Sequence, residues 1–133
     1  MSTKITITIA SLLTVSALLN ATAAPDLSKL PPASTKTGLT YDKDIKAIFE
    51  KSCFKCHGAE KQKGKLRVDS LEAVLKGGED GAILTKGDSK KGVLVVAVAR
   101  LEDDSAMPPE GKGEPLSKEQ VGLIRAWIDQ GAK

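Results

Sequence analysis

The chain has 133 residues, with 20 Lys and Arg against 17 Asp and Glu. This length suits one domain, and the nearly balanced charge excludes the strongly basic class of proteins that bind nucleic acid. With only one Trp, one Tyr and two Phe, a domain of this size buries little apolar surface unless a large apolar cofactor joins its core.

Residues 1–23 have the pattern of a cleaved signal peptide. Lys4 precedes an apolar run from Ile5 to Leu19, and the small residues Ala23 and Ala24 follow. We expect cleavage near residue 23 or 24 and export to the periplasm or an equivalent compartment. The alternative is an uncleaved anchor, but the run is short for a bilayer and is interrupted by Thr and Ser. The mature form is therefore predicted to have no membrane span.

Residues 24–38 are rich in Pro, Ser, Thr and Lys and show little apolar periodicity. This composition predicts a flexible linker. The folded domain is predicted to cover residues 39–133.

Apolar residues at helical spacing predict a first helix that starts near Asp42, with Thr40 or Asp42 as its cap, and runs into Cys53. Its apolar positions are Ile45, Ile48 and Phe49. A second, shorter helix is predicted to be capped by Asp69 and ended by Gly77 and Gly78. Its apolar positions are Leu71, Val74 and Leu75.

The segment from Ser89 to Arg100 is open between two structures, because Asp88 could cap a helix while the valine-rich composition suits a strand equally well. The last helix is clearer. Ser117 and Gln120 have the spacing of a capping box, and Gly131 is placed to end the helix. Its apolar stripe consists of Val121, Ile124, Trp127 and Ile128.

Cys53-Phe54-Lys55-Cys56-His57 matches the pattern for covalent attachment of c-type haem. Two thiols separated by two residues can reach the two vinyl groups on one edge of the porphyrin, and the adjacent imidazole then lies beneath the iron. The signal is specific because both cysteines and the single histidine of the chain lie within these five positions.

This motif has three alternatives to haem attachment. A disulfide between the two cysteines would close a very short loop, which gives little stabilisation. Thioredoxin-like exchange usually requires a neighbouring strand and helix pattern, and that pattern is absent. A structural zinc site would need four ligands, whereas the motif offers three. Haem attachment is favoured over all of them.

Met107 is predicted to be the second axial ligand of the iron. No other histidine exists, and Met1 would leave with the signal peptide. Met107 precedes Pro108 and Pro109, which restrict the backbone and would hold the sulfur in place. Core filling is the alternative role for a lone methionine, but this loop is an unfavourable core segment.

Ligation by histidine and methionine raises the reduction potential relative to ligation by two nitrogen atoms. It also leaves no axial position open for oxygen or peroxide. The sequence therefore favours an electron carrier over an enzyme. The alternative is a haem enzyme of peroxidase type, or a ligand sensor, in which the distal position is open because Met107 is not bound.

Further residues occur in an order shared with a known family. They are Ile45 to Phe49, Cys53 to Gly58, Lys65 to Asp69, Gly77-Gly78, Gly81, Gly87-Asp88-Ser89, Met107-Pro108-Pro109 and Trp127 to Ala132. This order resembles the planctomycete-type cytochrome c domain and, more broadly, the class I cytochrome c fold. The resemblance covers nearly everything from Leu39 to Lys133.

The resemblance implies an all-α domain, a small helical bundle around one covalently bound haem, in which the first and last helices cross near the haem. It also implies that residues 89–100 are helical and that Met107 is the distal ligand. Phe49 and Trp127 would pack at the crossing and against the porphyrin, or serve as ordinary core residues. Arg67 could hydrogen-bond a haem propionate, because a guanidinium matches carboxylate geometry, or could simply be exposed.

The predicted partners are redox proteins that the exported protein would meet in its compartment. Lys61, Lys63 and Lys65 follow the cysteine motif in a polar loop. They could steer an acidic partner towards the haem edge, or they could simply be solvated.

Overall fold

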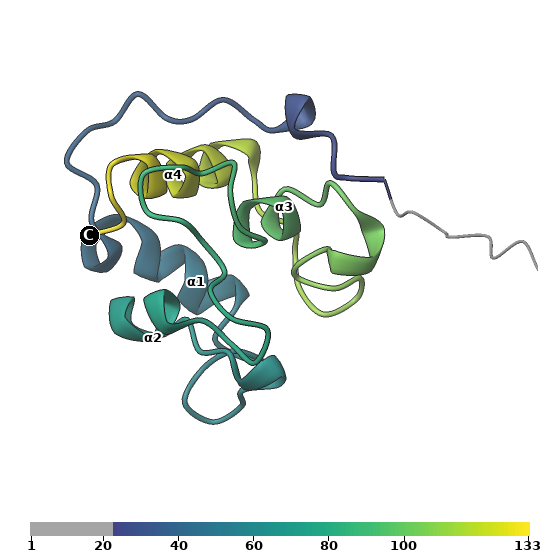
Figure 1. The fold of residues 1–133 in the computed structure, drawn as a ribbon. Helices are drawn as coiled ribbons and strands as arrows, with labels where there is room; N and C mark the ends of the chain where they lie inside the picture. The colour runs from purple at the N-terminus through teal and green to yellow at the C-terminus, as the bar shows by residue number, and fades with distance from the viewer. Residues whose placement is uncertain (1–22) are drawn as a thin grey trace, which may run out of the picture.

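The structure, a computed structural model, describes residues 23–133, so nearly all of the predicted signal peptide lies outside it. The α-helices are α1 (Lys46–Ser52), α2 (Leu71–Lys76), α3 (Leu94–Val98) and α4 (Lys118–Asp129). Figure 1 shows α1 between α4 and α2, with long loops joining them. Within the described part of the chain no β-strand forms, which confirms that the domain is mostly helical. None of its helices has the length and apolarity needed to cross a membrane.

The first helical segment begins with one π-helical turn, η2 (Tyr41–Ile45), and continues as α1 up to Cys53. Thr40, one of the two predicted caps, occupies the cap position, but its side chain makes no capping hydrogen bond, and Asp42 lies inside the first turn. Instead the Asp44 carboxylate accepts a hydrogen bond from the Thr40 N–H at 3.0 Å and pairs with Lys36. A carboxylate in the first turn satisfies a free N–H group of the helix start, so the start is held from inside the helix.

Helix α2 begins one residue later than predicted. Ser70, not Asp69, is its cap, and the Ser70 hydroxyl accepts a hydrogen bond from the Ala73 N–H at 3.1 Å. Asp69 is instead engaged by the Arg67 guanidinium. Gly77 ends the helix as predicted, with a positive φ of 79° that glycine adopts without a steric penalty.

The valine-rich segment is helical, but only from Leu94 to Val98. The helix that the family resemblance implies for residues 89–100 is therefore much shorter in the structure. Two valines of this helix, Val95 and Val98, are buried in the core. After α3 the chain passes through a short 3-10 turn, η4 (Asp103–Ser105), towards Met107.

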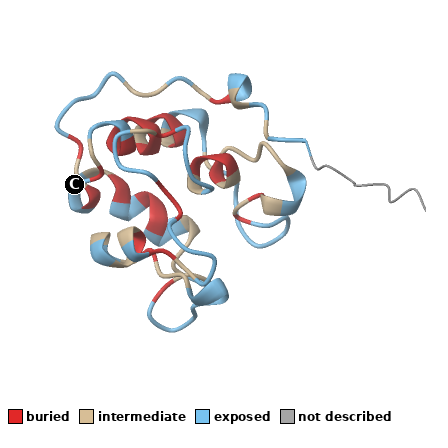
Figure 2. Ribbon diagram, in the orientation of Figure 1, coloured by how far each residue is buried: buried red, intermediate tan, exposed pale blue. Residues whose placement is uncertain are grey.

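Helix α4 has the predicted capping box. Ser117 accepts a hydrogen bond from the Gln120 N–H, and the Gln120 side chain accepts one from the Ser117 N–H at 2.8 Å. The predicted apolar stripe is buried along the length of the helix, as are the inward positions of α1 and α3 (Figure 2). These faces form one hydrophobic core.

Tyr41 lies at the centre of this core and is 1% exposed. Its ring lies 6.2 Å from that of Phe49 and 6.1 Å from that of Trp127, measured between centroids. Its N–H donates to the carbonyl oxygen of Lys133 at 2.7 Å, and its hydroxyl donates to that of Val68 at 2.5 Å. Tyr41 therefore joins α1, α4, the C-terminus and the loop before α2.

The segment before residue 39 lies along α4 (Figure 1). The Ser34 N–H donates to the Gly122 carbonyl oxygen at 2.9 Å, and the buried Arg125 donates to the Pro31 carbonyl oxygen. The Gln130 side chain donates to the Lys36 carbonyl oxygen at 2.8 Å. The predicted linker thus makes specific contacts with α4, and the packed part of the chain begins before residue 39.

The substitution Gly122→Ala tests this contact. A Cβ at residue 122 would lie 2.7 Å from the Pro32 carbonyl oxygen, so the segment along α4 must shift. We expect a lower free energy of unfolding, by about 1 kcal/mol or more, in urea denaturation. In a variant that begins at Leu39 the obstacle is gone, and the same substitution should stabilise α4 by up to ~1 kcal/mol, because Ala is the better helix former. A stabilising effect in both backgrounds would contradict the packing described.

The buried hydroxyl of Tyr41 predicts a pH dependence of stability. Burial, followed by the negative charges of Asp69 and Asp42, raises the pKa of Tyr41 from 10.0 to about 12. The unfolded chain ionises first, so the stabilising contribution is complete below pH 10 and is lost as the pH rises from 10 to 12. We expect a loss of about 1–2 kcal/mol in urea unfolding over this range. Tyr41→Phe should have a lower free energy of unfolding at pH 8, but this free energy should fall less from pH 10 to 12 than that of wild type. Parallel curves of unfolding free energy against pH would contradict the raised pKa of Tyr41.

Candidate functional site

Cys53, Cys56 and His57 stand on a turn at the end of α1. Cys53 ends the helix, and its N–H donates to the Phe49 carbonyl oxygen at 2.7 Å. The N–H groups of Cys56 and His57 both donate to the Cys53 carbonyl oxygen, at 3.0 and 2.9 Å. The buried helix therefore fixes the backbone on which all three side chains are carried.

The residue after His57 has no room for a side chain. A Cβ at Gly58 would lie 2.5 Å from the carbonyl oxygen of Phe54, so the chain can fold back over the turn only with glycine here. The carbonyl oxygen of His57 then accepts a hydrogen bond from the Val68 N–H at 2.8 Å. Gly58 is thus required by the turn geometry, although no chemical role falls to it.

The structure brings Met107 to this turn. A single mostly apolar cavity of about 40 Å³ is lined by two segments far apart in the sequence. Its lining residues are Ser52, Cys53, Lys55, Cys56 and His57 on one side and Met107, Pro108, Pro109 and Lys112 on the other. The four side chains predicted to hold the cofactor therefore share one site.

The His57 ring is held by a backbone oxygen through one of its two nitrogens. Its Nδ1 lies 3.1 Å from the carbonyl oxygen of Lys63. Because a carbonyl oxygen can only accept a hydrogen bond, the proton of the neutral ring belongs on Nδ1. Nε2 then keeps its lone pair and is available as a metal ligand, and the bond to the carbonyl fixes the orientation of the ring. The sequence did not indicate Lys63 for this role, since its backbone oxygen is what acts.

The two cysteines are free thiols. Burial, followed by the charge of Cys56, raises the pKa of Cys53 to about 11. Cysteines that exchange disulfides have lowered pKa values, because the thiolate is the attacking species. The protonated state of Cys53 thus argues against the thioredoxin-like alternative.

The donor set fits haem c. Two thiols at the required spacing, a free imidazole nitrogen and a thioether sulfur line the same cavity. The volume is smaller than such a group needs, because pockets for ligands of comparable size have about 300–1,000 Å³. The side that carries Met107 and the side that carries the cysteines must therefore move apart to admit a porphyrin.

The Met107 side of the cavity is hydrogen-bonded to the end of α3. The Met107 N–H donates to the Ala97 carbonyl oxygen at 3.0 Å, and the Arg100 guanidinium donates to the Pro108 carbonyl oxygen at 2.6 Å. The Met107–Pro108 peptide bond is cis. No sequence signal marks Arg100, because its partner is a backbone oxygen in a loop.

Phe49 and Trp127 lie in the core, and both are 0% exposed. They pack on the two sides of Tyr41, and the Trp127 indole N–H donates to the Lys133 carbonyl oxygen at 2.9 Å. Neither lines the cavity with Met107. Both are part of the hydrophobic core, on either side of Tyr41.

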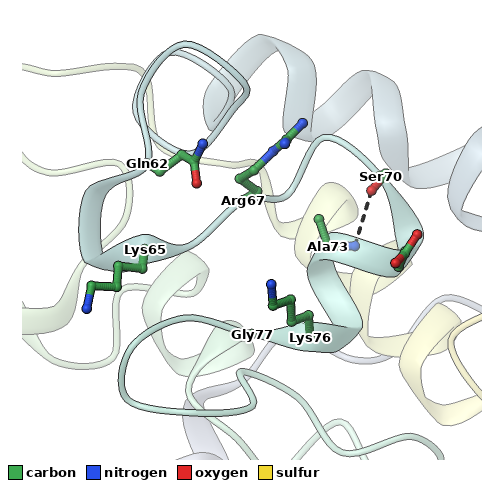
Figure 3. Close-up of a pocket in the computed structure, with 8 residues that line it drawn as sticks. Gln62, Lys65, Arg67, Ser70, Ala73, Lys76 and Gly77 are labelled. Carbon is green, nitrogen blue, oxygen red and sulfur yellow. Dashed lines mark hydrogen bonds between the residues drawn. The ribbon is translucent and has the colours of Figure 1, made fainter.

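Arg67 lies apart from the cavity. It lines a separate, more polar pocket of about 250 Å³ between the η3 turn (Lys63–Lys65) and α2 (Figure 3). Its guanidinium makes two hydrogen bonds to the Asp69 carboxylate, at 2.9 and 2.6 Å, and these hold the pKa of Asp69 below its ordinary value. The two pockets share no lining residue, so the structure does not bring Arg67 to the other predicted site residues.

Comparison with known proteins gives one match. No curated protein and no solved structure matches the chain. Residues 53–111 match the family model described as Planctomycete cytochrome C. The matched range begins at Cys53 and includes Cys56, His57 and the Met107 segment, so it spans both sides of the cavity. This part of the chain is a planctomycete cytochrome c domain, as the order of residues in the sequence indicated.

Proposed function

We propose that the protein is an exported mono-haem c-type cytochrome that carries electrons. Haem c would be attached through Cys53 and Cys56, with His57 and Met107 as the axial ligands of the iron. The observation that carries this proposal is the convergence of these four side chains on one cavity. The cytochrome c family supports covalent haem attachment at this cysteine spacing.

Each residue has a separate task in this function. The cysteines hold the cofactor permanently, which would keep it in place in a dilute exported compartment. His57 would bind the iron through Nε2, with Nδ1 held by the Lys63 carbonyl oxygen. Met107 would supply the second ligand. Haem c supplies the one-electron chemistry when bound, and occupation of both axial positions favours electron transfer over reactions with oxygen or peroxide.

Export is supported by the sequence of residues 1–23. A lysine, an apolar run and small residues near position 23 are the features that a signal peptidase requires. The cleavage position near residue 23 or 24 leaves the whole segment that contacts α4 in the mature chain. The proposed compartment is the periplasm or an equivalent exported space.

The proposed partners are acidic redox proteins that approach the cavity. Lys61, Lys63 and Lys65 are exposed, and Lys65 lines the pocket of Arg67. Lys55 and Lys112 are better placed, because both are exposed and both line the cavity, one on each side. These two lysines would draw a negatively charged partner to the cofactor edge.

Replacement of Met107 tests the axial ligation. Natively matured wild-type protein should be six-coordinate and low-spin, with a methionine-to-iron charge-transfer band. Met107→Leu should abolish the band completely, lower the reduction potential and allow cyanide to bind the ferric form, because the thioether ligand is lost. Absorption spectra of both oxidation states, with a potentiometric titration, measure these effects.

Val93→Ala is a matched control, because Val93 is 62% exposed and lies away from the cavity. It should leave the spectrum and the potential unchanged. A wild-type protein that is five-coordinate, high-spin and binds cyanide as readily as Met107→Leu would instead support the alternative, a haem enzyme or ligand sensor.

Salt dependence tests the role of the lysines. Reduced protein should react with the anion hexacyanoferrate(III) more slowly as salt rises from about 0.01 M to about 1 M, because the Debye length falls from about 30 Å to about 3 Å. The double variant Lys55→Gln/Lys112→Gln should slow this reaction at low salt by up to about tenfold. Lys90→Gln, at an exposed position outside the cavity, is the control. Rates that do not depend on salt would exclude electrostatic guidance.

A further inference from the structure

The end of α3 holds the Met107 segment through two hydrogen bonds. The Met107 N–H donates to the Ala97 carbonyl oxygen at 3.0 Å, and the Arg100 Nη1 donates to the Pro108 carbonyl oxygen at 2.6 Å. One bond precedes the Met107 side chain along the backbone and the other follows it. The second has a charged donor, which makes it the stronger kind.

Few other hydrogen bonds tie this segment to the described part of the domain, although Ala106 and Pro108 are also buried. Pro108 and Pro109 have no N–H group to donate. The other backbone bond in the segment, from the Lys112 N–H to the Pro109 carbonyl oxygen at 3.0 Å, is internal to it. The position of the thioether therefore depends on the attachment to α3, whose Val95 and Val98 are buried in the core.

Arg100 occupies a position where glycine is the usual residue. Its N–H donates to the Ala97 carbonyl oxygen at 3.1 Å, and the Leu101 N–H donates to the Val96 carbonyl oxygen at 3.2 Å. This pair of bonds is the Schellman arrangement, whose first residue after the helix cap is left-handed. Arg100 has the corresponding positive φ of 54°, which is uncommon for a residue with a side chain. Glycine would make the same two backbone hydrogen bonds without the steric cost, so the arginine side chain is not needed for the Schellman arrangement itself.

We propose that Arg100 is a positioning residue for Met107, which holds the thioether at the iron by fixing the Pro108 carbonyl. This inference rests on the proposed function, since it presupposes that Met107 is an axial ligand. The Arg100 bond favours the ligated position of the segment over positions in which an external ligand can enter. Its loss should loosen the sulfur without harming the fold.

Arg100→Gly separates these two effects. Glycine adopts the left-handed conformation without strain, which offsets part of the lost hydrogen bond, so the variant should unfold at a urea concentration close to that of wild type. Loss of one charge-assisted hydrogen bond should shift the segment towards the open position, and ferric holoprotein should bind cyanide about 10- to 100-fold more tightly. Arg100→Lys, which keeps a charged donor without the planar fork, should lie between the two.

Lys65→Gly is the matched control. Lys65 also has a positive φ, 52°, but lines the other pocket. It should gain the same backbone freedom and leave cyanide affinity and the charge-transfer band unchanged. If wild type shows the band and Arg100→Gly binds cyanide no more tightly, the positioning role is wrong and the ligation stands. A wild type without the band overturns both proposals together.

Discussion

The hydrogen bond from the Tyr41 hydroxyl to the Val68 carbonyl oxygen links the hydrophobic core to the turn that carries His57. The Val68 N–H is in turn bonded to the His57 carbonyl oxygen at 2.8 Å. The same tyrosine packs against Phe49 and Trp127 and binds the C-terminal carbonyl through its N–H. The position of the histidine backbone is therefore set by the contact between the first and last helices, although neither helix carries one of the four side chains predicted to hold the cofactor.

The two sides of the cavity are supported very differently. The cysteine and histidine side follows α1 directly and is held by a dense set of backbone hydrogen bonds. The Met107 side is a loop with two prolines, joined to a short helix by one backbone bond and one arginine. Under the proposed function, covalent attachment and a firm imidazole belong to the rigid side. The side with the exchangeable ligand is the one whose position rests on the fewest contacts.

Much of this arrangement could be predicted from the sequence where the signal is local. The cysteine motif predicted where the site lies, because the spacing of the two thiols matches that of the two vinyl groups of a porphyrin. The capping box of Ser117 predicted the start of α4. The predicted cap of α2, Asp69, was wrong by one residue, because Asp69 binds Arg67 and Ser70 caps the helix instead. The contacts of residues 31–36 also could not be foreseen. Their composition is that of a linker, and their partners Gly122 and Arg125 lie far along the chain. The role of Arg100 could not be foreseen either, because its partner is a backbone oxygen, which no sequence pattern marks.

The small cavity has a consequence for how the protein would be assembled. A space of about 40 Å³ holds little more than a water molecule. Under the proposed function, haem would reach Cys53 and Cys56 only while the segment of Met107 and Pro108 is displaced from them. The thioether bonds would then form first, and the return of Met107 to the cavity would be the last step of maturation.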